Sequence, residues 1–202
     1  MEGKSRFWLI GVRQMRGHIA ALQSAMLSAP RGFDRAVCTI LGLKGKVFVT
    51  GVGTSGCIAR RFAHLLCCCG VSGVFVETSA LINGSAGCLS KADLLFIITK
   101  SAKGNGLEDL SNVARAIGCK IAIQSGIRPA WARASDVILE VDYSQSKDLL
   151  GQIATTSSLI NAAICDCICA TVLQEKGQTD EKLLSIHPEG GVGATLRLKK
   201  GN

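Results

Sequence analysis

Aromatic side chains are scarce in this chain of 202 residues, at 4% with a single Tyr. Their scarcity disfavours nucleic-acid binding that depends on stacking bases against aromatic rings. Proline is rare too, at three residues, which disfavours proline-rich linkers. Charged residues make up 19% against 48% hydrophobic residues, so the composition predicts a folded chain with a buried core, of the size of one domain.

Long hydrophobic runs of the kind that cross a membrane are also lacking. The apolar run 7–12 is too short for a signal peptide, and no small-residue cleavage pattern follows it. The apolar stretch 157–173 contains Asn161 and Asp166 and is short for a membrane span. We therefore expect no membrane segment and a cytoplasmic protein.

Cysteine, by contrast, is abundant at ten residues. Three are consecutive at 67–69, and three alternate at 165, 167 and 169 within an expected helix. Neighbours on a helix point to different faces, so neither pattern predicts a metal site. We expect reduced thiols that act as small buried apolar residues, and no bound metal.

The net charge of +8, from 23 basic and 15 acidic residues, favours an anionic partner. The basic residues are scattered, with only the doublets 60–61 and 199–200. This scatter disfavours nucleic acid and a membrane surface and leaves a phosphate ester as the favoured partner.

Hydrophobic spacing predicts a helix that ends at residues 30–32, then a second helix over 34–41. Short apolar runs then alternate with helical stretches, and a long helix follows at 153–175. The expected strands are 47–50, 74–76, 94–99, 120–124 and 136–141. This alternation predicts an α/β fold, a three-layer αβα sandwich with a five-stranded parallel sheet of the flavodoxin-like kind. We expect residues 1–42 to pack as N-terminal helices on a core formed by 43–202, with ligands at the carboxyl ends of the strands.

The loop after the first expected strand, Gly51–Gly56, is rich in glycine and contains Ser55. Glycines let a ligand approach the backbone, and a helix start offers free N–H groups. A dinucleotide site remains an alternative, because Gly56 and Glu77 fit its fingerprint. A Walker-type phosphate loop does not fit, because no Gly-Lys-Ser/Thr follows.

Two further helix starts carry hydroxyl groups. The loop Thr99–Gly104 includes Ser101 and two lysines, and the stretch Ala154–Ser158 opens the long helix. Each alone is an ordinary helix cap. Three hydroxyl-rich starts at one edge of a parallel sheet, in a basic protein, predict a phosphate monoester site.

The tail contains His187 between Ile186 and Pro188, followed by a glycine-rich stretch. We read this segment as a loop that fixes the direction of the imidazole, and His187 as a candidate catalytic residue. His18 and His64 lie in helical stretches, where a structural role is favoured.

From Leu43 to Leu196 the chain resembles the sugar isomerase (SIS) domain, and within it the KpsF/GutQ group of arabinose-5-phosphate isomerases. The first loop is similar to that family's G-x-G-K-S-G-H and the second to its S-N-S-G-E-T. The long helix opens at Ala154 like its A-P-T-T-S, and His187–Leu196 is similar to its H-P-G-G-A-L-G-R-R-L.

The resemblance implies interconversion of an aldose phosphate and a ketose phosphate, without a cofactor. It implies a homodimer or homotetramer in which the His187 tail completes a neighbour's site. Longer members carry two regulatory CBS modules after the tail, which we expect to be absent because the chain stops at Asn202. The implied phosphosugar-binding residues are Gly53, Thr54, Ser55, Thr99, Ser101, Thr155 and Thr156.

Several of the family's polar positions differ in this chain. Its Lys and His in the first loop are replaced by Thr54 and Cys57, and a further His by Asn83. Its Glu in the second loop is Lys103, and its Glu before the long helix falls at Ser146.

Isomerisation moves a proton between C1 and C2 through an enediol, which needs a base and an oxyanion donor. We assign His187 as the base, Lys103 as the donor and Glu189 as a replacement base. One alternative is a non-catalytic protein that senses a sugar phosphate. A weaker alternative, nucleotide or nucleic-acid binding, depends on charge and glycine content alone.

Overall fold

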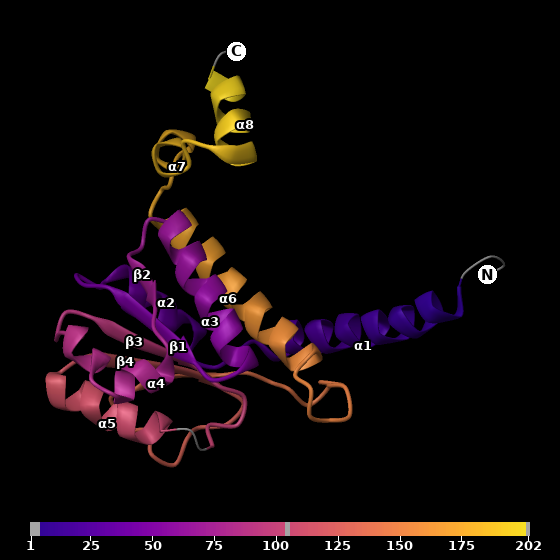
Figure 1. The fold of residues 1–202 in the computed structure, drawn as a ribbon, viewed down its shortest axis with the longest axis horizontal. Helices are drawn as coiled ribbons and strands as arrows, with labels where there is room; N and C mark the ends of the chain where they lie inside the picture. The colour runs from indigo at the N-terminus through magenta and orange to yellow at the C-terminus, as the bar shows by residue number, and fades with distance from the viewer. Residues whose placement is uncertain (1–4, 104–105, 201–202) are drawn as a thin grey trace.

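The computed structural model describes residues 5–103 and 106–200, and within these ranges five parallel strands form one sheet in the order β2-β1-β3-β4-β5 (Figure 1). The strands are β1 (Val47–Gly51), β2 (Gly73–Phe75), β3 (Leu94–Ile98), β4 (Lys120–Ser125) and β5 (Val137–Glu140). The helices are α1 (Arg6–Ser28), α2 (Phe33–Leu41), α3 (Thr54–Cys68), α4 (Thr78–Ile82), the short 3-10 helix η1 (Ser85–Cys88), α5 (Leu107–Ile117), α6 (Thr156–Glu175), α7 (Asp180–Ile186) and α8 (Gly190–Lys200). The α/β fold and the parallel sheet are as the sequence predicts.

Helices cover both faces of the sheet. Successive residues of a strand point to opposite faces, so Leu94, Phe96 and Ile98 of β3 enter one core with α2, α3 and α6. Leu95 and Ile97 enter the other core, with α4, η1 and α5. Burial on both faces explains why the strand is apolar throughout.

The N-terminal segment packs on this body through its second half. Ala21 and Ala25 of α1 are buried, and α1 contacts α6. The first half of α1 extends away from the body (Figure 1), with Phe7 81% exposed and Trp8 51% exposed. The first residue of the expected N-terminal segment 1–42 and the last residue of the expected core 43–202 lie outside the described residues.

One described helix, α6, is long and apolar enough to cross a membrane by length and composition alone. Its position explains that composition, because Ile160, Ile164, Ile168 and Val172 are buried in the core beneath α1, α2 and α3. A helix that is apolar on several faces is typical of the centre of a fold. We conclude that α6 is a core helix.

The tail differs from the expected loop. It forms two short helices, α7 and α8, that pack on each other and stand away from the sheet (Figure 1). Thr179 caps α7 by accepting a hydrogen bond from the N–H of Lys182. His187 ends α7, so the loop is confined to the junction of the two helices.

The expectation that the cysteines are buried is only half right. All ten are free thiols, but they divide between core and surface. Cys69, Cys119, Cys165 and Cys169 are buried, and burial raises the pKa of Cys119 to about 11. The other six are exposed or half-buried, so the consecutive cysteines of α3 face different surroundings.

Two glycines seat the start of α3 against the end of β1. A side chain at Gly56 would place its Cβ 2.7 Å from the carbonyl oxygen of Gly51. A Cβ at Gly51 would lie 2.9 Å from the carbonyl oxygens of Ile98 and Ser55. Helix and strand therefore touch backbone to backbone, and only glycine permits this approach.

We predict that Gly56→Ala lowers the free energy of unfolding by about 1–3 kcal/mol, the usual cost of overpacking. Urea unfolding would measure the loss. The matched control is Gly87→Ala, because a Cβ at Gly87 meets no atom within 4 Å. Equal effects of the two substitutions would contradict the packing argument.

Candidate functional site

The candidate site lies at the carboxyl edge of the sheet. Gly51, the last residue of β1, pairs with Ile98, the last residue of β3. The chain then leaves β1 towards α3 on one face and β3 towards α5 on the other face. Ligands of open parallel sheets bind where two neighbouring strands diverge in this way.

The first loop gives α3 an open start. Gly53 precedes the helix with a φ of 59°, and Thr54 and Ser55 form its first turn. Thr54 is exposed and Ser55 is half-buried. Gly53 also lines a cavity of about 370 Å³ shared with α4 and Asn83. The first N–H groups of a helix lack intrahelical partners, so this turn can donate to an anion.

A dinucleotide site would need the Glu77 carboxylate to be free to bind a ribose. Glu77 instead forms an ion pair with Arg60. Arg60 Nη2 lies 3.1 Å from Glu77 Oε1, and the guanidinium also stacks on Phe75. Glu77 is thus already engaged by the helix that would hold the dinucleotide. The structure therefore gives the dinucleotide alternative no support.

The second loop is held in a tight turn. The N–H of Ala102 donates to the hydroxyl of Thr99 at 3.1 Å, and Ala102 has a φ of 56°. Thr99 is buried and shapes the turn, whereas Ser101 and Lys103 are exposed. Lys100, Ser101 and Lys103 line a cavity of about 450 Å³. Gly104, the last residue of the predicted loop, lies outside the described residues.

The start of α6 is already occupied by a carboxylate, that of Asp148. Its Oδ1 accepts hydrogen bonds from the N–H groups of Thr155 (3.0 Å) and Ser157 (2.9 Å). Its Oδ2 accepts from the Ser157 hydroxyl (2.7 Å) and from Lys100 Nζ (2.7 Å). The Asp148 side chain is 4% exposed. Asp148 thus connects the second loop to the third.

The predicted phosphate ligand Thr156 is fully buried beneath this carboxylate. Its hydroxyl donates to the carbonyl oxygen of Lys147 at 2.9 Å and lies 3.0 Å from Nδ1 of His18. Thr155 is half-buried, and its hydroxyl accepts from the N–H of Leu149. Neither hydroxyl faces an open surface in this arrangement.

The surroundings of Asp148 keep it ionised. Burial opposes the charge, but hydrogen bonds from Lys100 and Ser157 outweigh it and lower the pKa to about 2. A carboxylate this acidic is a weak proton acceptor near neutral pH. Its chemistry is therefore that of a fixed negative charge.

Sequence reasoning missed Asp148. It precedes its backbone donors Thr155 and Ser157 by seven and nine residues, which no local capping pattern covers. The available signal was an acidic residue between the last strand and a hydroxyl-rich helix start. The position expected to match the family's Glu, Ser146, instead holds a buried hydroxyl without a hydrogen-bond partner among the described residues.

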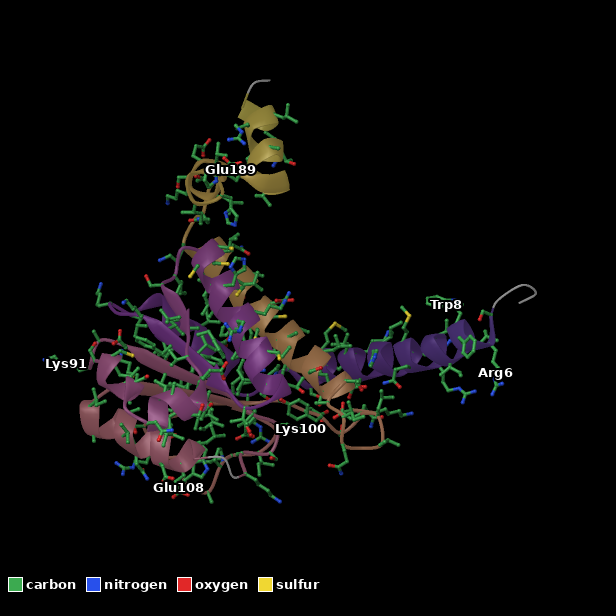
Figure 2. The ribbon with its side chains drawn as sticks, in the orientation of Figure 1. Arg6, Trp8, Lys91, Lys100, Glu108 and Glu189 are labelled. Atoms are coloured by element: carbon green, nitrogen blue, oxygen red, sulfur yellow. The ribbon has the colours of Figure 1, made fainter. Side chains whose placement is uncertain are left out.

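The catalytic candidate His187 lies at the other end of α3. Its Nε2 is 3.5 Å from Sγ of Cys68, the last residue of α3, whereas Ser55 stands in the first turn. A helix of 15 residues is roughly 22 Å long. Figure 2 shows Glu189 on the tail, far from Lys100 at the carboxyl edge. One chain therefore does not bring His187 or Glu189 to its own Ser55, Ser101 and Lys103.

Within the ranges 5–103 and 106–200, no group of three or more His, Cys, Asp or Glu side chains is placed to hold a metal ion. The hydroxyl, amide and ammonium groups at the carboxyl edge are donors to anions. The edge therefore suits an anionic ligand.

Comparison with known proteins shows which proteins share this sequence and fold. No protein-family model matches the chain. The arabinose 5-phosphate isomerase KdsD of Shigella flexneri is 30% identical over 171 residues, which cover 84% of this chain and 52% of that protein. A solved protein of Escherichia coli CFT073, in complex with arabinose 5-phosphate, superposes with a TM-score of 0.82 at 22% identity, covering 92% of this chain and all of that one.

The chain has the sugar isomerase (SIS) domain fold. It is a distant homologue of the arabinose 5-phosphate isomerases KdsD and GutQ and spans about half the length of those relatives. The NanR protein of Vibrio vulnificus, complexed with ManNAc-6P, shares the fold with a TM-score of 0.74 at 17% identity, over 88% of this chain and 67% of that chain. The resemblance noted from the sequence motifs is thus confirmed for the SIS domain.

We predict that the Asp148 carboxylate stabilises this SIS domain in a pH-dependent way. Its pKa is about 2 in the folded chain, against about 3.9 for an unperturbed Asp. The stabilisation, about 2 kcal/mol, is present above pH 4 and is lost as the pH falls from 4 towards 2. Asp148→Asn removes it.

Unfolding free energies of wild type and Asp148→Asn, measured from pH 2 to pH 7, would test this. Their difference should be constant above pH 5 and shrink below pH 4. Glu175→Gln, at the exposed C-terminal end of α6, is the charge-matched control. Parallel pH profiles for wild type and Asp148→Asn would show that the carboxylate carries no such stabilisation.

Proposed function

We propose that the protein binds a sugar phosphate at the carboxyl edge of its sheet and, as an oligomer, interconverts the aldose and ketose forms of that sugar. The observation that carries the proposal is the meeting of two anion-binding loops. The first turn of α3 and the loop 99–103 start at the paired residues Gly51 and Ile98. Relatives of the same fold are described in complex with arabinose 5-phosphate and with ManNAc-6P.

The phosphate would be held by groups that face the open edge. Thr54 and Ser55, with the backbone at Gly53, supply donors from the start of α3. Ser101 supplies a hydroxyl beside the 450 Å³ cavity, which Lys100 and Lys103 also line. Each charge-assisted hydrogen bond is worth about 1.5–3 kcal/mol. Several of them, less the cost of ordering, give affinities in the micromolar to millimolar range.

Thr99 serves this site through the turn that it shapes, as its hydrogen bond to Ala102 indicates. Thr155 and Thr156 remain phosphate ligands in the proposal inferred from the resemblance. Their hydroxyls would become available only after the segment that carries Lys147 and Asp148 moves.

Catalysis would require two copies of the chain. His187 and Glu189 lie about one helix length from the loops of their own chain but stand on a tail that projects from the body (Figures 1 and 2). In a homodimer or homotetramer, the tail of one copy can reach the carboxyl edge of another. His187 would then transfer the proton between C1 and C2, with Glu189 as an additional base and Lys103 as the donor to the enediolate.

A non-catalytic sensor of a sugar phosphate is the second candidate. It is favoured by the residues that stand at Thr54, Cys57 and Asn83 in place of the family's acid–base groups. In both candidates we place the protein in the cytoplasm, in carbohydrate metabolism. The two candidates share the binding site and differ in turnover.

The binding site can be tested with arabinose 5-phosphate by titration calorimetry. We predict that Ser55→Ala and Ser101→Ala each weaken binding by about tenfold or more, because each removes one donor to the phosphate. Lys91→Ala is the control, since this exposed lysine lies away from Lys100 in Figure 2 and precedes β3. Unchanged affinity in both site variants would remove the proposed phosphate site.

The shared catalytic site can be tested with a coupled assay over pentose and hexose phosphates. We predict that His187→Ala lowers kcat by roughly 10²–10⁴ while ligand affinity is unchanged. His64→Ala is the control, because His64 also contacts Cys68 but lies within α3. Binding without any turnover in wild type would favour the sensor.

Mixing two impaired variants, assayed at a substrate concentration too low to saturate Ser101→Ala, separates a shared site from a site within one chain. His187→Ala lacks the tail group, and Ser101→Ala lacks a loop group. Mixed oligomers of the two should regain part of the activity, because some edges would meet an intact tail. Mixtures that show only the summed activities of the two parents would contradict a shared site.

A further inference from the structure

Asp148 stands at the base of a short hairpin that precedes α6. Leu149 and Ile153 form an antiparallel bridge, and residues 147–155 close the hairpin; we name this segment the 147–155 hairpin. The Asp148 carboxylate accepts hydrogen bonds from the N–H groups of Thr155 and Ser157, from the Ser157 hydroxyl and from the ammonium group of Lys100. Four donors thus converge on one buried anion.

This donor set is the kind that recognises a phosphate group. Two backbone N–H groups at a helix start, one hydroxyl and one lysine are the usual partners of a phosphate at a helix N-terminus. Two of the three loops that the sequence predicts to bind phosphate, 99–104 and 154–158, supply these donors. Here an internal carboxylate takes the place that a ligand's anion would fill.

Apart from Asp148, the hairpin is held at its base, where the Lys147 carbonyl oxygen accepts from Thr156 and Gln14 and the Leu149 N–H donates to Thr155, and residues 149–153 beyond that base are exposed. Leu150 at its tip is 90% exposed and has a φ of 54°, a strained conformation for a branched side chain. Leu149 and Ile153 are also exposed, at 44% and 54%. The apolar tip gains nothing from the core, so the hairpin can shift without opening the cores on either face of the sheet.

We propose that Asp148 is an internal competitor of the ligand's phosphate: it holds the anion position at the start of α6 in the ligand-free protein, and the phosphate displaces it. The inference rests on the proposed function. Displacement would free Lys100, Ser157 and the N–H of Thr155 for the ligand.

The exchange also sets the ligand class. A sugar phosphate carries close to two negative charges at neutral pH and three acceptor oxygens, whereas Asp148 carries one charge and two oxygens. A phosphate monoester can therefore replace the carboxylate and form stronger electrostatic interactions with the same donors. A neutral sugar cannot, and a sugar acid would exchange one carboxylate for another. The 147–155 hairpin would thus select phosphate esters over both.

The decisive experiment measures the dissociation constants of inorganic phosphate and of arabinose 5-phosphate at fixed ionic strength. For Asp148→Asn we expect binding of both to tighten by about tenfold or more, even though the variant is less stable, since the competing charge is gone. The control is Asp166→Asn, farther along α6, where the carboxylate pairs with the guanidinium of Arg61. It should leave both constants within about twofold of wild type.

If Asp148 were purely a structural cap, Asp148→Asn would not tighten phosphate binding. If Asp148 only orders the start of α6, Asp148→Asn binds phosphate equally or more weakly while wild type still binds, and the inference is overturned. If neither wild type nor Asp148→Asn binds phosphate or arabinose 5-phosphate, both this inference and the proposed function are overturned. Detectable binding by Asp148→Asn alone would support both.

A measurement on wild type keeps the inference testable if Asp148→Asn does not fold. The carboxyl ¹³C resonance of Asp148 can be followed by NMR while phosphate is added. It should move in step with phosphate binding, because the carboxylate exchanges its four donors for water. A resonance that stays unchanged at saturating phosphate would overturn the displacement.

Discussion

Backbone contact between the end of β1 and the start of α3 places the first turn of this helix at the carboxyl edge of the sheet. Gly51 and Gly56 allow the helix to begin directly at the strand, beside the end of β3. The free N–H groups of the first turn of α3, which contains Ser55, therefore lie at the carboxyl edge of the sheet. A side chain at either glycine would push the helix away and remove the donors together with the packing.

The charges at this edge are arranged around one anion position. Lys100 and the start of α6 would be a strong positive site without Asp148, whose buried carboxylate neutralises it. The Asp148 side chain is buried whereas that of Lys100 is 44% exposed, so loss of the lysine would leave a buried carboxylate without its cation. The pair therefore stabilises the ligand-free fold and, in our account, reserves the position for a phosphate group.

The length of α3 imposes the second constraint. The helix starts at the anion-binding loop and ends at Cys68, where His187 is held. A proton-transfer group on the tail and a phosphate site at the first turn cannot meet within one chain. In our proposal, binding and catalysis are therefore separable, and catalysis depends on association of copies.

Much of the fold could be predicted from the sequence, because parallel strands buried on both faces read as short apolar runs such as that of β3. The loops at Gly53 and Ser101 could be predicted as well, since glycine and hydroxyl residues mark helix starts. The role of Asp148 could not, because its donors come from Lys100, far away in sequence, and from amides beyond a hairpin. Nor could the helices around His187, which have few buried residues and therefore a weak hydrophobic pattern.

The most direct test of the account is a crystal structure of the protein soaked with arabinose 5-phosphate. The account predicts the phosphorus atom within hydrogen-bonding reach of Ser55 and Ser101, with the Asp148 carboxylate displaced from the start of α6. A phosphate group bound elsewhere on the chain, or bound at the edge with Asp148 still in place on Thr155 and Ser157, would contradict it.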